Sequence, residues 1–140
     1  MLRCTPFLLF DGQCAEAMAF YQEALGGSLK LTRLADTPMK EQFPASKHRR
    51  IISAHLHSGA IEISAADWMA SPVFDPQPGN MAAVFVTGAS VPELRPVFDR
   101  LARDAEPARF QDLHRMPFGI YGQFYDRYGT QWIFRDGAAA

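Results

Sequence analysis

One order of predicted elements occurs twice along this chain, and it constrains the fold more than any other feature. The order is strand, helix, strand, long loop and hairpin. In the first half these elements are predicted at 7–10, 15–25, 28–34, 35–50, and 51–56 with 60–65. In the second half the strand, helix, short strand and hairpin strands are predicted at 81–86, 91–102, 108–111, and 121–125 with 131–134. The repeat predicts an α+β fold of two βαβββ modules, forming a curved mixed sheet around a cavity with helices on the outer face.

Local signals support these elements and set their limits. The apolar run 7–10 predicts a buried strand, and Gly26-Gly27 ends the first helix because glycine adopts positive φ at low cost. Ser58-Gly59 predicts a tight turn between two strands. Pro96 interrupts the second helix, which therefore either starts nearer to Pro96 or kinks there. The 140 residues suit one domain, 1–140, with module one at about 1–78 and module two at about 79–136.

Composition excludes several classes of partner. A net charge of −1 gives no electrostatic attraction to nucleic acid or to an anionic membrane. Cys4 and Cys14 form neither a CxxC pair nor a zinc pattern. No apolar run approaches the ~20 residues of a membrane span, and the start of the chain lacks a signal-peptide pattern. We therefore expect a cytoplasmic protein with reduced thiols.

Both ends of the chain carry family motifs. Phe7–Gly12, Phe20-Tyr21 and Leu25–Gly27 open it, and Phe118–Gly122 and Asp126–Ile133 close it. These segments resemble the PhnB-like branch of the vicinal-oxygen-chelate (glyoxalase/bleomycin resistance/dioxygenase) superfamily. That branch carries a misleading "demethylubiquinone methyltransferase" label, and the chain has no glycine-rich nucleotide loop after a strand. The resemblance implies paired βαβββ modules and a homodimer.

The resemblance also implies four metal-ligand positions in relatives that bind a divalent metal. They fall on Thr5 or Pro6, on Glu62, on Asn80 or Met81, and on Ile133. Only Glu62 has a side chain typical of such sites, and a bound metal needs several charged or imidazole ligands. We therefore expect no cofactor and no complete family metal site, and a divalent metal at another site stays open.

His55 could supplement Glu62. With Ser58-Gly59 as the turn, His55 would lie directly opposite Glu62, about 5 Å away, on the cavity face. A carboxylate beside imidazole suits a general base, so both residues are candidate catalytic residues. They could also supply two ligands of an unusual metal site, and a structural ion pair is the alternative. A one-residue change of register would separate them.

Aromatic and polar side chains in the second half are candidate ligand-binding residues. Alternation places Tyr121 and Gln123 on one strand face, which we assign to the cavity together with Trp132. Trp68 follows the fourth strand and could close one end of the cavity, and His114 lies in the loop predicted at its mouth. An ordinary aromatic core and an exposed loop are the alternatives.

Three functions remain open on these residues. The first is binding of a small organic ligand in the cavity, without the full metal site. The second is a lyase, isomerase or dioxygenase-type enzyme using His55 and Glu62. The third is an antibiotic-sequestering resistance protein, against which the charge of −1 argues mildly, since such relatives are acidic.

Overall fold

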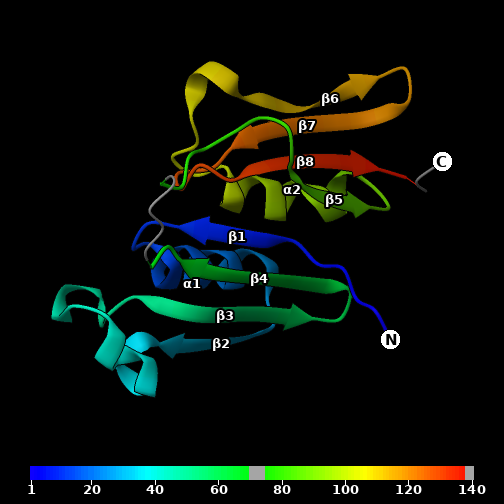
Figure 1. Cartoon of the computed structure of the whole chain (residues 1–140). Coiled ribbons are helices and arrows are strands. Elements are labelled where there is room, and N and C mark those ends of the chain that lie inside the picture. Colours follow the sequence, from blue (N-terminus) through cyan, green and yellow to red (C-terminus); the bar gives the residue numbers. More distant parts are fainter. Residues whose placement is uncertain (70–74, 138–140) are drawn as a thin grey trace. The chain divides into compact units, whose positions relative to one another are not determined.

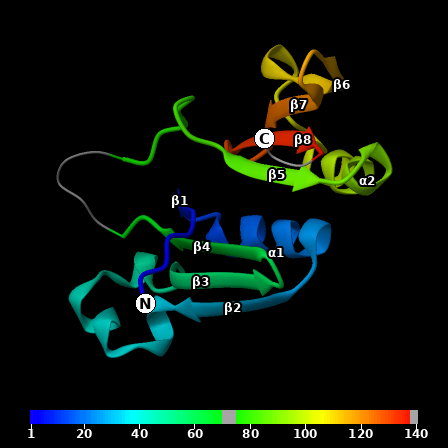
Figure 2. The same cartoon turned by 90° about the vertical axis from the view of Figure 1, so that its right-hand side faces the viewer.

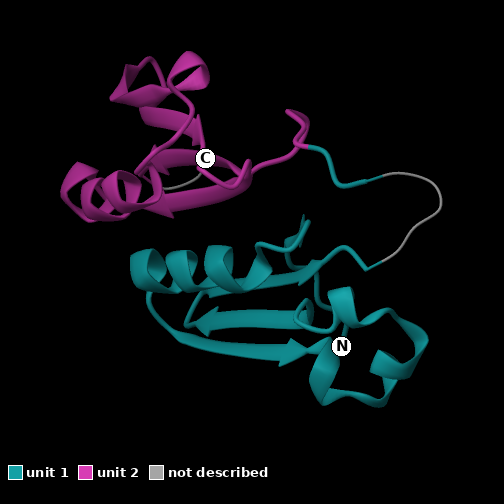
Figure 3. Cartoon of the chain, turned by 90° about the vertical axis from the view of Figure 1, so that its left-hand side faces the viewer, with its two compact units in different colours: residues 1–77 teal, residues 78–140 magenta. Residues whose placement is uncertain are grey.

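A computed structural model of the chain describes residues 1–69 and 75–137. The chain divides into two compact units, 1–77 and 78–140 (Figure 3). Each unit contains a four-stranded mixed sheet and one α-helix, which confirms the predicted α+β class with two βαβββ modules. The division lies one residue from the predicted module boundary, and the assignment of both units to one domain stays a prediction.

The first unit is built around the sheet β1-β4-β3-β2, with α1 along one face (Figures 1 and 2). Strand β1 pairs with β4 in parallel, and the other pairs are antiparallel. In chain order the elements are β1 (Phe7–Phe10), α1 (Cys14–Leu25), β2 (Ser28–Arg33), three 3₁₀ helices (Leu34–Asp36, Pro38–Gln42 and Ala45–Lys47), β3 (Ile51–Ser58) and β4 (Ile61–Asp67).

The second unit repeats this topology in the sheet β5-β8-β7-β6, where β5 and β8 are parallel. Helix α2 packs against β5 and β8. In chain order the elements are β5 (Val84–Gly88), α2 (Val91–Leu101), a 3₁₀ helix (Pro107–Arg109), β6 (Gln111–Met116), β7 (Gly119–Tyr125) and β8 (Gln131–Asp136).

The face that its helix covers is the more deeply buried face of each sheet. In the first unit Met18 and Tyr21 of α1, Leu56 of β3 and Ile63 of β4 are at most 2% exposed. The pairing of Phe7 with Ser64 places Phe7 on the opposite face, where it is 59% exposed. The prediction that strand 7–10 is buried is therefore wrong for this face of β1.

In the second unit the core is aromatic. Phe98 of α2 makes edge-on contacts with Phe124 and Phe134, with ring centroids 4.9 and 5.0 Å apart. Trp132 pairs with Phe124 across β7 and β8 and is fully buried. Even-numbered residues of β7 and β8 thus face α2, and the odd-numbered ones lie on the opposite face, which is more open except at the buried Tyr125.

A buried carboxylate joins α1 to the end of its sheet. Asp67, 3% exposed, accepts hydrogen bonds from the backbone N–H groups of Gly12, Cys14 and Ile51 at 2.8, 3.0 and 2.9 Å. Two of these donors lie at the N-terminal end of α1, where N–H groups lack intrahelical partners. Burial, assisted by this carboxylate, raises the pKa of the Cys14 thiol to about 12.

Several predicted boundaries differ from the structure. Helix α2 starts at Val91 and continues through Pro96, so the alternative of a start near Pro96 is wrong. Strand β5 begins at Val84 rather than 81, and β6 covers 111–116, whereas we predicted a short strand at 108–111 followed by a loop. The β6 sequence contains no β-branched or aromatic residue, so it lacks the usual composition of a strand.

The described helices are short. The longer α-helix has 12 residues, and within 1–69 and 75–137 no helix is long and apolar enough to cross a bilayer.

Candidate functional site

The β3-β4 hairpin has a different register from the predicted one. Ser58 pairs with Ile61, so Gly59 and Ala60 form the connection. His55 lies opposite Ser64, and Glu62 lies opposite His57, so the predicted direct pairing of His55 with Glu62 is wrong. The difference is two residues. Because side chains alternate with a period of two, His55 and Glu62 still share one face of the sheet, as predicted.

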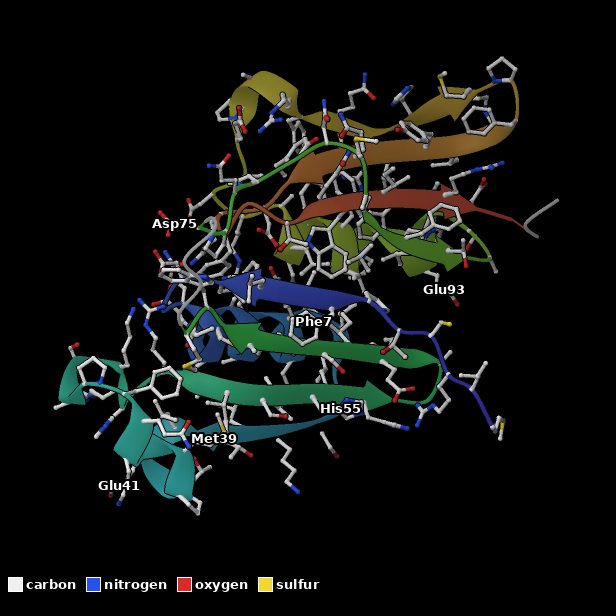
Figure 4. The ribbon with its side chains drawn as sticks, in the orientation of Figure 1. Phe7, Met39, Glu41, His55, Asp75 and Glu93 are labelled. Carbon is white, nitrogen blue, oxygen red and sulfur yellow. The ribbon has the colours of Figure 1, made fainter. Side chains whose placement is uncertain are left out.

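The diagonal arrangement still brings His55 and Glu62 together on this open face. Nε2 of His55 lies 3.3 Å from Oε1 of Glu62. The second oxygen of Glu62 forms an ion pair and hydrogen bond with Arg3. Nδ1 of His55 lies 3.3 Å from Oγ of Ser64. Figure 4 shows His55 and Phe7 on the side of the sheet turned away from α1.

These contacts define the protonation pattern of the imidazole. A carboxylate can only accept, so the contact with Glu62 favours a proton on Nε2 of His55. In the neutral ring Nδ1 then accepts a hydrogen bond from the Ser64 hydroxyl. The side chains of Ser64, His55 and Glu62 are thus arranged in sequence, and a proton can be held or moved along this line.

The internal repeat tests the family metal positions. Phe7 pairs with Ser64 in the first unit, as Phe85 pairs with Ile133 in the second. The counterpart of Ile133 is therefore Ser64, not Glu62, which lies two residues nearer the turn. Glu62 is also neutralised by Arg3, which would compete with a cation. Among the described residues no three His, Cys, Asp or Glu side chains gather at one point, so the residues do not fit the family's metal set.

The open face of the second unit is aromatic and basic. Tyr121 of β7 lies between His114 of β6 and Arg135 of β8 in the sheet register. The rings of His114 and Phe118 contact Tyr121 edge-on, with centroids 6.0 and 5.9 Å away. The Arg135 guanidinium stacks over Phe118 at 4.3 Å. Aromatic surface and hydrogen-bond donors therefore lie together on one exposed sheet face.

The other predicted ligand-binding residues fall in three different environments. Gln123 shares the face of Tyr121, with its amide nitrogen 3.3 Å from the carbonyl oxygen of Arg109. Trp132 does not share it: it lies on the α2 side, where Nε1 donates to Asp126 at 2.8 Å. The predicted cavity position of Trp132 is therefore wrong. Trp68 directly follows β4, beneath Lys47 at 5.0 Å, and its buried Nε1 has no hydrogen-bond partner among the described residues.

Sequence reasoning missed Ser64, Arg3 and Arg135. Ser64 follows from the alternation of β4 once Glu62 is placed, since i and i+2 share a face. Arg135 would have followed from assigning the apolar Trp132 and Phe134 to the core. Nothing in the sequence indicated that Arg3, before the first strand, pairs with Glu62.

Comparison with known proteins identifies the relatives of this fold. The model of the family described as 3-demethylubiquinone-9 3-methyltransferase matches residues 2–134. Protein PA1353 from Pseudomonas aeruginosa is 26% identical, with a TM-score of 0.80 over 97% of this chain and 98% of that one. A putative 3-demethylubiquinone-9 3-methyltransferase, PhnB protein, from Bacillus cereus is 23% identical, with a TM-score of 0.73 over 97% and 100%.

A more distant structure shares the fold. The glyoxylase/bleomycin resistance protein/dioxygenase domain from Frankia sp. EAN1pec is 15% identical, with a TM-score of 0.63 over 100% of this chain and 95% of that one. No curated protein matches the chain. The family match and the shared topology confirm the resemblance inferred from the two ends of the sequence. The chain belongs to the family described as 3-demethylubiquinone-9 3-methyltransferase, and it shares its fold with the glyoxylase/bleomycin resistance protein/dioxygenase domain.

Proposed function

We propose that this protein binds a small organic ligand on the open sheet face of its second unit, without the full metal site of the family. The observation that carries the proposal is the exposure of Phe118, which is 51% exposed although its ring contacts Tyr121 and the Arg135 guanidinium. Exposed apolar surface rimmed by polar groups is typical of binding sites. The family's name adds no activity, since a fold alone does not give a reaction.

Mapping of aromatic fragments tests this proposal. The isotope-labelled full chain is titrated with a fragment library, and backbone amide shifts are followed by NMR. We expect shifts clustered in β6, β7 and β8, and Phe118→Ala should weaken the binding of the best fragment by about 10-fold through lost aromatic contact. Phe110→Ala is the matched control, because Phe110 packs on Phe98 on the α2 side. Shifts scattered over both units, or equal losses in both variants, would contradict the proposal.

A second candidate function uses the first unit. His55 lies between the Ser64 hydroxyl and the Glu62 carboxylate, each at 3.3 Å, and this geometry supports a general base in a lyase, isomerase or dioxygenase-type reaction. Glu62→Gln preserves size and removes the charge. If the candidate is right, this variant loses turnover of any substrate found, by about 100-fold or more, and keeps its fold. Full activity in Glu62→Gln would exclude the role.

Three further properties belong to the proposal. We expect a homodimer, measurable by sedimentation as twice the 15.6 kDa mass of the chain. We also expect a cytoplasmic location and reduced thiols. The metal content of protein purified without chelator gives a separate check: stoichiometric Zn, Ni, Fe or Mn would contradict the metal-free part of the proposal.

A further inference from the structure

Four hydrogen-bonding side chains form a continuous row across the second sheet. In register, Thr87 of β5 pairs with Arg135 of β8, Arg135 with Tyr121 of β7, and Tyr121 with His114 of β6. Directly paired residues place their side chains on the same face, about 5 Å apart. The row therefore presents a hydroxyl, a guanidinium, a phenol and an imidazole side by side, and it contains no carboxylate.

Arg135 is the unusual member of this row. Its guanidinium stacks on Phe118, and within residues 1–69 and 75–137 no carboxylate forms an ion pair with it. By contrast, Arg95 of the same unit forms ion pairs with Asp99 and Asp112, and Arg109 forms one with Glu106. A stacked guanidinium keeps its edge N–H groups free for a planar, two-pronged acceptor.

The charged groups around the row do not compensate Arg135. Asp136, the next residue, is directed to the backbone N–H of Ile120, which donates to Oδ1 at 2.8 Å. Asp112 is engaged by Arg95, which lowers the pKa of this carboxyl by hydrogen bonding. Nδ1 of His114 lies 2.7 Å from the carbonyl oxygen of Asp112, which can only accept, so Nδ1 carries a proton. This N–H is therefore engaged, and the free donors of the row are the guanidinium of Arg135 and the hydroxyls of Tyr121 and Thr87, with the positive charge on Arg135.

The adjacent row on the same face is less polar. Phe85 pairs with Ile133, and Ile133 pairs with Gln123. Phe85 is 53% exposed. A ligand that fits both rows therefore has an apolar or aromatic body and one negatively charged end.

The first unit does not carry this arrangement. Phe10 pairs with Asp67 as Gly88 pairs with Asp136, so the counterpart of Arg135 is Ala66 and the counterpart of Thr87 is Leu9. The donor row is therefore a property of the second unit alone, and it is not dictated by the βαβββ topology.

We infer that Thr87, Arg135 and Tyr121 of this row form an oxyanion-binding subsite, bordered by His114, that selects ligands with a carboxylate, phosphate or phosphonate group. The inference rests on the proposed function and adds the chemical class of the ligand. Arg135 forms two parallel N–H···O bonds to the oxyanion, with the Tyr121 hydroxyl as a further donor. The ligand's body lies over Phe85 and Ile133.

The test compares charged and uncharged probes of similar size on the full chain. Phenylphosphonate, benzoate and benzyl alcohol are titrated into the labelled protein at low and high salt, and affinities are taken from backbone amide shifts. We expect both anions to bind at β7 and β8 more tightly than benzyl alcohol, and their binding to weaken with salt.

Matched variants identify the residue responsible. Arg135→Gln should weaken phenylphosphonate binding by about 10-fold, and Arg135→Lys by less, because lysine keeps the charge and loses the fork. Tyr121→Phe removes only the hydroxyl and should give about a 3-fold loss. Arg115→Gln is the control: Arg115 pairs with Ile120, on the other face of β6, and its loss should change the affinity by less than about 2-fold.

Two results would overturn the inference while the proposed function stands: benzyl alcohol binding as tightly as phenylphosphonate, or unchanged affinity for phenylphosphonate in a folded Arg135→Gln variant. If neither the three probes nor the fragment library perturb β6, β7 and β8, the inference and the proposed function both fail. Amide spectra of each variant outside these strands show whether it is folded.

Discussion

The two cysteines lie in opposite surroundings. Cys4 is exposed, and Cys14 is fully buried at the start of α1. Burial and the nearby Asp67 carboxylate raise the pKa of Cys14 to about 12. Since the thiolate is the reactive form, Cys14 stays protonated and unreactive at neutral pH.

This difference predicts a thiol count that depends on folding. With Ellman's reagent at pH 8, Cys4 of the native protein should react and release one equivalent of thionitrobenzoate from the reagent. Unfolding in guanidinium should expose Cys14 and release a second equivalent. In Cys4→Ser the native protein should give no rapid reaction. Rapid reaction of two thiols in the folded protein would contradict the burial of Cys14.

Prediction at the level of single residues succeeded where it only had to say which residues of a strand share a face. The face shared by His55 and Glu62 was correctly predicted, although the register differs by two residues, because an even shift preserves the face. Trp132 was misplaced because alternation gives two sets of residues and does not say which set faces the helix. Ser64 could be identified as the counterpart of Ile133 only from the strand register, in which Phe7 pairs with Ser64 and Phe85 pairs with Ile133. The sequence alone does not give this register.

At the scale of elements, α2 contains two prolines with different consequences. Pro92 lies in the first turn, where a backbone N–H has no intrahelical acceptor. Pro96 lies in the interior, where it removes one hydrogen bond and crowds the carbonyl of Pro92. Its side chain is exposed, so replacing it changes little packing.

The prolines therefore provide a matched pair of variants. Pro96→Ala should raise the free energy of unfolding by about 1–2 kcal/mol, as an interior proline costs about 3 kcal/mol and alanine loses about 1 kcal/mol more backbone entropy on folding. Pro92→Ala should be neutral or destabilising by up to about 1 kcal/mol. Urea unfolding measures both. Equal changes in the free energy of unfolding of the two variants would show that the position of a proline in the helix does not determine its effect on stability.

Element prediction followed the strength of the local pattern. Helix α1 and the β7-β8 hairpin were predicted to within two residues at every end, because helical periodicity, glycines and aromatic residues all agree there. Strand β6 was predicted too early, at 108–111, because most of its six residues are polar and none is β-branched, and they gain their strand conformation from pairing with β7. Tertiary pairing of this kind has no signal within the strand itself.

For the whole molecule, the repeat preserves topology and not chemistry. Both sheets have the same strand order and the same parallel pair, yet the open face of the first carries His55 and Glu62 while that of the second carries Tyr121 and Arg135. Large substitutions on the buried face, which packs against the helix, cost several kcal/mol of stability. Residues on the open face can vary more freely. The two open faces can therefore serve different ligands.

The sequence contains two tryptophans, and each unit holds one of them. Trp132 is fully buried against the α2 side of the second sheet, and Trp68 follows β4 in the first unit. In Trp68→Phe the emission reports only the second unit, and in Trp132→Phe only the first. If the chain is one cooperative domain, the urea transition followed by fluorescence should coincide in each variant with the transition followed by far-ultraviolet circular dichroism.

Non-coincident transitions within one variant would instead show that the units unfold separately. A Tyr121→Phe substitution in the Trp68→Phe and Trp132→Phe variants provides a control. It removes only one hydroxyl on an open face, so the unfolding transitions should stay the same. One tryptophan in each unit thus gives each unit its own fluorescent reporter. Ligand binding can be followed by the same tryptophan emission in the two single-tryptophan variants, without attaching a dye.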